Sequence, residues 1–119
     1  MKVKQKSLNL KTGKQGEVKA KKYIAKKLKY KILETNYQNA LGEIDIIAKN
    51  KDVIIFVEVK SKTTLDFGAP SEEVTPKKQD KIRKVALLYL KEKSLTDANF
   101  RFDVAEVLND ELNYISNAF

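Results

Sequence analysis

Two acidic residues and a lysine stand in strongly apolar stretches of the chain. Asp45 lies within the segment 42–48, and Glu58 and Lys60 lie within the segment 53–61. A charged side chain in a stretch typical of a buried strand is costly unless it is paired or binds a metal. Two carboxylates that hold Mg²⁺, with a lysine beside them, can hydrolyse a phosphodiester bond. The pattern therefore predicts a metal-dependent catalytic centre.

The two apolar segments are expected to be neighbouring strands joined by a tight hairpin at residues 50–52. Side chains alternate between the faces of a strand, so Glu58 and Lys60 share one face. Counting outward from the middle of the turn pairs residue 45 with residue 57. A shift of one residue would instead put Asp45 beside Glu58, about 5 Å away at the backbone and near enough to share an ion.

The tripeptide acid-x-Lys is a weak signal by itself. A second copy, Glu17-Val18-Lys19, lies in a predicted helix, and an exposed cross-strand ion pair is the alternative explanation for Glu58 and Lys60. The chain has no His and no Cys, which excludes Ser-His triads, His general bases and ordinary zinc sites. Any metal would be held by oxygen atoms, which favours Mg²⁺ or Mn²⁺.

The positive charge is concentrated at the start of the chain. The net charge is +8, and residues 1–31 contain twelve lysines and one acid, Glu17. Such a distribution is typical of a surface that binds a polyanion; the alternative is a solvated lysine-rich helix that serves solubility. No segment approaches the roughly 18 apolar residues of a membrane span. We therefore expect a soluble, cytoplasmic protein with no membrane partner.

The length of 119 residues fits one domain. We expect a flexible basic arm over residues 1–12 and a single domain over residues 13–119. Within it, the apolar periodicity predicts a helix from residue 12 or 13 to 28, strands at 30–36, 43–48 and 53–61, a long connection at 63–75, a helix from 76 to about 93, a strand at 102–108 and a tail at 112–119. Thr75 and Pro76 are expected as the cap and first residue of the second helix. This order predicts an α/β fold with one mixed sheet and helices packed on it.

Several segments closely resemble the YraN family of small bacterial proteins. They are residues 42–48, 56–60, 78–79, 101–103 and 117–119, and the likeness covers nearly the whole chain from about residue 13. That family is in turn similar to the PD-(D/E)xK nuclease superfamily and especially to archaeal Holliday-junction resolvases. The resemblance implies a restriction-endonuclease-like αβββαβ core with a mixed central β-sheet flanked by helices. This agrees with the order expected from the apolar pattern.

The resemblance also implies roles for individual residues. Asp45 would be the central metal ligand, Glu58 the second ligand and Lys60 the catalytic lysine. Glu17 would complete the metal shell, directly or through water, and the Val59 carbonyl would be a main-chain ligand. The cofactor would be Mg²⁺ or Mn²⁺. For Glu17 a simpler alternative is that it is the one acid balancing a basic helix, near whose N-terminus it suits the helix dipole.

Contacts to nucleic acid are expected from both helices and from the end of the third strand. The residues predicted to make them are Lys14, Lys21, Lys22, Lys62, Lys78 and Gln79. Lys62 stands where many YraN relatives carry Arg; it keeps the charge but loses bidentate phosphate geometry. Gln79 has an alternative as an ordinary surface residue. By analogy with junction resolvases, the partner would be DNA and the protein a homodimer.

The sequence thus predicts a Mg²⁺-dependent endonuclease acting on structured or branched DNA. One alternative is a catalytically silent nucleic-acid-binding module with a nuclease-like fold. Another is a protein-interaction domain whose lysines serve solubility only. Arg101 and Asp103 share a strand face and are expected to form a structural ion pair.

Overall fold

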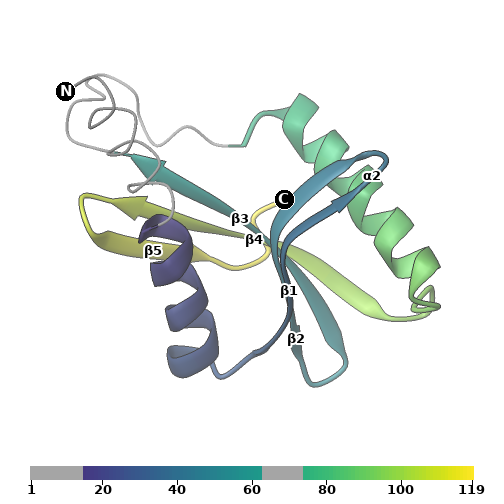
Figure 1. Cartoon of the computed structure of the whole chain (residues 1–119), viewed down its shortest axis with the longest axis horizontal. Helices are drawn as coiled ribbons and strands as arrows, with labels where there is room; N and C mark the ends of the chain where they lie inside the picture. Colours follow the sequence, from purple (N-terminus) through teal and green to yellow (C-terminus); the bar gives the residue numbers. More distant parts are fainter. Residues whose placement is uncertain (1–14, 63–73) are drawn as a thin grey trace.

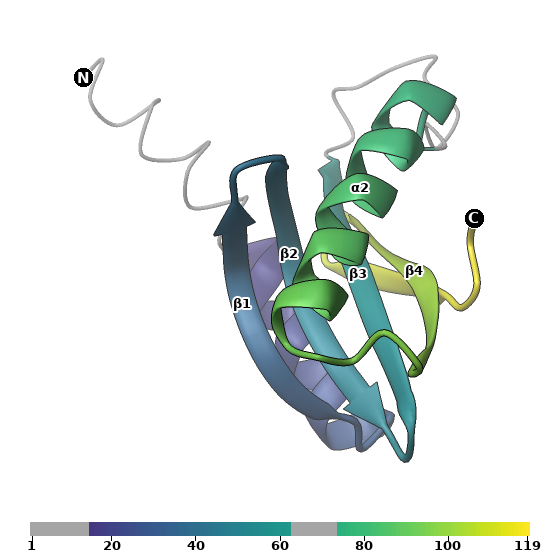
Figure 2. The ribbon, with the colours of Figure 1, turned by 90° about the vertical axis from the view of Figure 1, so that its right-hand side faces the viewer.

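The structure, a computed structural model, describes residues 15–62 and 74–119. Five strands form one mixed sheet in the order β1-β2-β3-β4-β5. β3 and β4 pair in parallel and the other neighbours pair antiparallel. One helix covers each face, as Figures 1 and 2 show. The arm predicted at residues 1–12, the start of the first helix and nearly all of the connection at 63–75 lie outside the described residues.

The elements have the following bounds. The N-terminal helix is described over residues 15–27, and its last part, η1 (Tyr23–Lys27), is π-helical; then come β1 (Lys31–Asn39), β2 (Gly42–Asn50), β3 (Val53–Lys62), α2 (Pro76–Glu92), β4 (Asn99–Leu108) and β5 (Glu111–Ile115). The predicted order of helix, three strands, helix and strand is therefore confirmed. None of the described helices is long and apolar enough to cross a membrane.

Two hydrophobic cores lie on opposite faces of the sheet. Ile54 and Phe56 of β3 pack in the core beneath α2. Ile55 and Val57 pack in the core beneath the N-terminal helix, with Ile24 at its centre. Because both faces of β3 are covered, its sequence is an almost unbroken apolar run. A charged residue on β3 is therefore sheltered from water unless it lies near the strand's end.

The second helix begins as the sequence predicts. Thr75 is its cap, with the Thr75 hydroxyl accepting a hydrogen bond from the Lys78 N–H at 3.2 Å, and Pro76 is its first residue. Its apolar side includes Val85 and Tyr89, both buried against the sheet. This start fixes the first turn of α2, which carries Lys78, close to the end of β3.

The structure differs from the prediction at strand ends. The first strand, predicted to end at residue 36, continues to Asn39 as β1, and only Ala40 and Leu41 form the turn to β2, which begins at Gly42. Asn36 accounts for the difference: it takes a left-handed φ of 51° within the strand, a conformation that Asn tolerates well. The prediction of a tail at 112–119 is also wrong in part, because residues 112–115 belong to β5, which pairs with β4.

Candidate metal centre

The hairpin between β2 and β3 has a turn of two residues, 51–52. The last backbone pair of this ladder joins Ile46 to Val57, and the next position puts Asp45 across from Glu58. This is the shifted register that the sequence left open. The count that paired residue 45 with residue 57 is wrong by one, because it treated the turn as three residues centred on one of them.

Asp45 lies where β2 separates from β3. Ile44 and Ile47 both pack on the α2 side of the sheet, whereas Ile46 packs on the other side, so the usual alternation of side chains is interrupted at Asp45. Beyond this point the β1–β2 hairpin curves toward α2 while β3 continues in its own direction (Figure 1). The Val59 N–H, which has left the β2 ladder, donates to Asp45 Oδ2 at 2.8 Å. The carboxylate thus takes the place of a strand neighbour.

The two carboxylates at this fork are near enough for a hydrogen bond between them when one is protonated. Burial and, next, the negative charge of Glu58 raise the pKa of Asp45 from 3.8 to about 6, while the Val59 N–H and the charge of Lys78 act in the opposite direction. The Glu58 side chain is only 10 % exposed. A pair of like charges held together in this way is favourable only with a proton or a cation between them.

Lys78 reaches the pair from the first turn of α2. Its Nζ lies 3.1 Å from Glu58 Oε1, and its side chain is 51 % exposed. Gln79, the next residue, donates instead from Nε2 to the Val74 carbonyl at 2.8 Å. The structure therefore brings Lys78 to the carboxylates, whereas the Gln79 amide fastens the segment that leads into α2.

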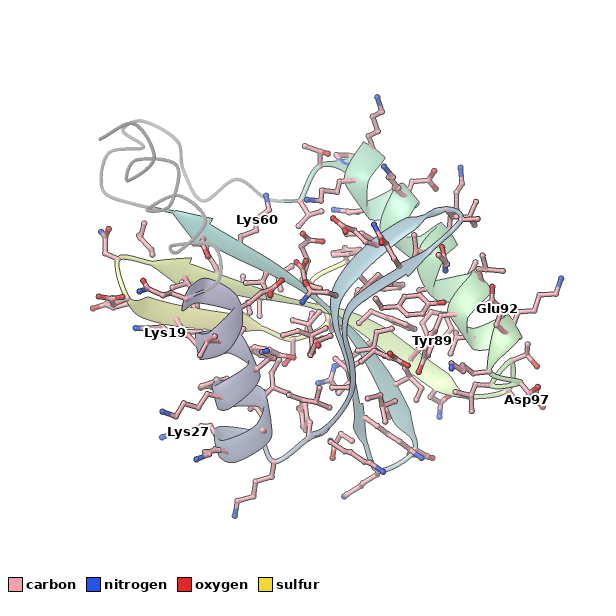
Figure 3. All side chains as sticks on the ribbon, viewed as in Figure 1. Lys19, Lys27, Lys60, Tyr89, Glu92 and Asp97 are labelled. Atoms are coloured by element: carbon pink, nitrogen blue, oxygen red, sulfur yellow. The ribbon has the colours of Figure 1, made fainter. Side chains whose placement is uncertain are left out.

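Lys60 shares a face of β3 with Glu58, because the two are two positions apart. This is the face on which Ile54 and Phe56 pack toward α2. Lys60 is half-buried and lies in register with Glu106 of the neighbouring β4; it is labelled in Figure 3. Three of the predicted site residues, two carboxylates and one lysine, thus belong to one end of the sheet.

Glu17 follows a glycine that lies directly against β3. Gly16 is buried, and a methyl group on it would collide with the Ser61 hydroxyl. The first described turn of the N-terminal helix therefore contacts the same end of β3 that carries Glu58. Among the residues that the structure describes, however, no three acidic side chains form a group able to hold a metal ion. Glu17 is thus near this end of β3 but is not joined to Asp45 and Glu58.

The remaining predicted contacts are more dispersed. Lys21 and Lys22 belong to the N-terminal helix, whose Ala20 and Ile24 cover the face of the sheet opposite α2. Lys14 and the side chain of Lys62 lie outside what the structure describes. The lysines of the first helix therefore do not surround the carboxylate pair; they form a separate basic surface.

The donor set fits a hard divalent ion. All its atoms are oxygen, from Asp45, Glu58 and the main chain around Val59, and Mg²⁺ in proteins is commonly held by one or two carboxylates together with water and substrate phosphates. The mutual repulsion of the two carboxylates supplies a physical reason to bind a cation there.

One residue near the site was not predicted from the sequence. Asn36 lies across from Asp45 on β1, between the pairs Thr35–Ile46 and Tyr37–Ile44. The tolerance of Asn for left-handed backbone was the one sequence signal at this position.

A second buried acid has a different surrounding. Asp103 is 0 % exposed, and it accepts two hydrogen bonds from Arg101, at 3.0 and 3.1 Å, one from the Tyr114 hydroxyl at 2.6 Å and one from the Asn117 N–H at 2.8 Å. Arg101 also donates to the Tyr30 hydroxyl at 3.0 Å. The predicted structural pairing of Arg101 with Asp103 is confirmed.

Comparison with known proteins gives a consistent set of bacterial relatives. Residues 16–107 match the uncharacterised protein family UPF0102. A UPF0102 protein of Clostridium acetobutylicum is 50% identical over 118 residues, which cover 94% of this chain and 96% of that protein. One of Caldanaerobacter subterraneus is 47% identical over 122 residues (96% and 99%), and one of a Sulfurihydrogenibium species is 45% identical over 107 residues (90% and 92%). None of these names states an activity.

Proposed function

The chain belongs to the uncharacterised family UPF0102, the YraN family, and we propose that it is a Mg²⁺-dependent endonuclease that hydrolyses phosphodiester bonds in structured or branched DNA. The observation that carries this proposal is the contact between Asp45 and Glu58 at the fork of β2 and β3. A purely structural role would favour donors or positive charge around each acid and no second acid beside it. Asp45 has one such donor, the Val59 N–H, and Glu58 has Lys78, yet the two carboxylates also lie against each other.

In this proposal, Asp45 and Glu58 hold the ion, with the Val59 carbonyl as a main-chain ligand. When bound, Mg²⁺ neutralises charge on the phosphate and makes water a stronger nucleophile. The Val59 N–H holds Asp45 Oδ2 at 2.8 Å, which fixes the orientation of this carboxylate before any ligand arrives. Glu17 is a candidate for a contact through water, because it lies at the same end of β3.

Two lysines act on the substrate itself. Lys60 orients the attacking water or donates to the phosphate oxygens as negative charge builds up on them. Lys78 is half exposed and reaches Glu58 at 3.1 Å, so its ammonium lies at the edge of the pair, where it can attract a phosphate. The remaining lysines bind the backbone of the DNA by charge, which selects shape and carries no sequence information.

Cleavage of a labelled panel tests the proposal. The panel contains duplex, single-stranded, flap and four-way-junction DNA, and RNA, each incubated with Mg²⁺, Mn²⁺ or EDTA. We expect metal-dependent cutting that Glu58→Ala reduces by at least about 100-fold. The matched control is Glu92→Ala, which removes an exposed acid at the far end of α2 (Figure 3) and should leave cutting unchanged.

The other two functions give different results in the same experiment. A silent binding module would cut nothing but would bind nucleic acid with an affinity that falls as salt rises. If about six lysines contact duplex phosphates, the logarithm of the affinity should fall with the logarithm of salt at a slope of about −5. A protein-interaction domain would neither cut nor bind. Sedimentation of the same samples tests for the homodimer.

A further inference from the structure

A basic groove lies between the N-terminal helix and β5, on the face of the sheet opposite α2 and Glu58. Its volume is about 480 Å³. Figure 3 shows Lys19 and Lys27 extending from the helix to the same side of the molecule. The groove is lined by Lys19, Lys22, Tyr23, Lys26, Lys27 and Leu112.

The lysines of the groove differ in what holds them. Lys19 is tied to the turn between β4 and β5, with Nζ 3.3 Å from Asp110 Oδ1 and 2.7 Å from the Asp110 carbonyl. Lys22, Lys26 and Lys27 form no ion pair with any residue in the described parts of the chain. Three ammonium groups thus line one wall without a negative partner there.

The groove also contains apolar surface between these charges. Tyr23 and Leu112 are half-buried, and the Tyr23 ring lies 5.7 Å from that of Tyr114, tilted by 32°. The helix changes to π-helical form at this point, with the Leu28 N–H donating to the Tyr23 carbonyl at 3.0 Å. Single π-helical turns are rare and often occur at functional sites. This turn supplies three of the residues that line the groove.

We propose that this groove binds single-stranded nucleic acid, with a base against Tyr23 and Leu112 and the phosphates against Lys22, Lys26 and Lys27. Duplex DNA keeps its bases stacked inside, so it could contact the groove only through phosphates bound to these lysines. An unpaired strand also exposes flat base faces that stack on aromatic side chains beside a basic groove. The inference rests on the proposed function in that the polyanion is taken to be a nucleic acid. The groove would hold an unpaired strand of the same branched substrate.

Binding of a labelled oligothymidine and of a duplex of equal length, both measured by fluorescence anisotropy in EDTA, tests this. The groove variant is Lys22→Glu with Lys26→Glu. The matched control is Lys49→Glu with Lys51→Glu, which makes the same charge change on exposed lysines at the β2–β3 hairpin. We expect the groove variant to weaken oligothymidine binding about 10-fold or more relative to the control. The groove variant should weaken duplex binding as well, because the duplex would contact the same lysines, so the base contact needs a separate test.

A second variant reports on the base contact directly. The chain has no tryptophan, so Tyr23→Trp introduces a single indole into the groove. Its fluorescence should be quenched by oligothymidine and unchanged by the duplex, because only an unpaired base can stack on it. Far-ultraviolet circular dichroism of each variant identifies any that does not fold.

The results separate this inference from the proposed function. Equal loss of oligothymidine binding in the groove and control variants, or no quenching in Tyr23→Trp, would overturn the groove assignment even if the wild-type protein cuts DNA. Selective loss in the groove variant, with no cutting of any substrate, would support the groove and overturn the nuclease. A change in sedimentation confined to the groove variant, with oligothymidine binding intact, would instead indicate that a second copy of the chain occupies the groove.

Discussion

Asp45 and Asp103 both lie within the sheet, but the groups around them are opposite in kind. Asp103 is fully buried and accepts four hydrogen bonds, two of them from the guanidinium of Arg101. Asp45 accepts from the Val59 N–H, and the neighbouring charge that shifts its pKa most is that of another acid, Glu58. The charge of Asp103 is therefore compensated by Arg101, whereas the charge of Asp45 is opposed by that of Glu58.

This difference separates a structural acid from a candidate functional one more clearly than burial does. A buried charge with a full set of donors holds two or more segments in register, and removing it leaves its partner uncompensated. A buried pair of like charges weakens the fold unless a proton or cation joins it. Removing the charge should therefore have opposite effects at the two sites: it should destabilise the folded protein at Asp103 and stabilise it at Asp45.

The largest effect is expected at the structural acid. Asp103→Asn removes the charge that pairs with Arg101, whose side chain is only 23 % exposed. We expect the free energy of unfolding to fall by about 3–5 kcal/mol, measured by urea denaturation at pH 7. DNA cutting per folded molecule should be unchanged, because the network lies on the opposite face of the sheet from Glu58.

A surface acid gives the control for this prediction. Asp80 pairs with Lys84 at 3.2 Å on the outside of α2, with both side chains about two-thirds exposed. Asp80→Asn should lower the free energy of unfolding by less than about 0.5 kcal/mol. Equal effects of the two substitutions would show that the Asp103 network contributes no more than an exposed pair.

The same contrast shows what the sequence could and could not predict. The element order followed from apolar periodicity, because the strands and helices bury continuous or evenly spaced apolar residues. The start of α2 followed from the chemistry of Thr75 and Pro76. β5 was missed because an exposed edge strand buries little: only Leu112 and Tyr114 of its five residues turn inward, and two apolar residues do not define a period.

The site was predictable in its residue types but not in its register. Asp45 and Glu58 stand out because charge interrupts an apolar run, yet their alignment depends on a turn of two residues in which Lys51 takes a φ of 56°. Left-handed turn positions are usually signalled by Gly or Asn, and Lys gives no such signal. Nor can a sequence show that β2 leaves β3 at Asp45, since that depends on how the hairpin packs against α2.

The second prediction concerns stability and pH in the absence of metal. Because burial and Glu58 raise the pKa of Asp45 from 3.8 to about 6, the folded protein holds this proton more tightly than the unfolded chain does. The resulting stabilisation is complete below about pH 4 and is lost as pH rises through 6. Asp45→Asn removes that loss, so in EDTA at pH 7.5 it should be more stable than the wild type by about 1–2 kcal/mol, after allowance for partial exposure. Urea denaturation measures the difference.

Two controls sharpen this prediction. At pH 4 the two proteins should have nearly equal stability, because Asp45 is then protonated in the wild type. Adding Mg²⁺ at pH 7.5 should stabilise the wild type and not the variant, since an ion that binds only the folded state raises its stability. A variant that is less stable than the wild type in EDTA at pH 7.5 would mean that the Val59 hydrogen bond outweighs the repulsion from Glu58.

Removing one donor to the structural acid should have a smaller effect than removing the charge of Asp103 itself. Tyr114→Phe deletes the hydroxyl that lies 2.6 Å from Asp103 Oδ2 and leaves the other donors in place. The free energy of unfolding should fall by about 1–2 kcal/mol, since this is a hydrogen bond to a charged group. Thermal denaturation measures it, with Tyr37→Phe as the comparison, since the Tyr37 hydroxyl accepts a hydrogen bond from the neutral Asn39 amide at 3.3 Å. Equal losses would show that the bond from Tyr114 to Asp103 is no stronger than this neutral one.

The smallest effect should come from Lys78, a positive charge that lies beside the carboxylate pair. Lys78 is half exposed and 3.1 Å from Glu58, and its charge lowers the pKa of Asp45. Lys78→Gln should therefore raise the pKa of Asp45 further, by less than about one unit, because water screens half of the lysine. Carboxyl carbon-13 nuclear magnetic resonance follows the titration, with Lys84→Gln on the same helix as the control that should not move it. A shift as large as that caused by burial would mean that Lys78 already neutralises the pair, and the contrast with Asp103 would then be one of degree.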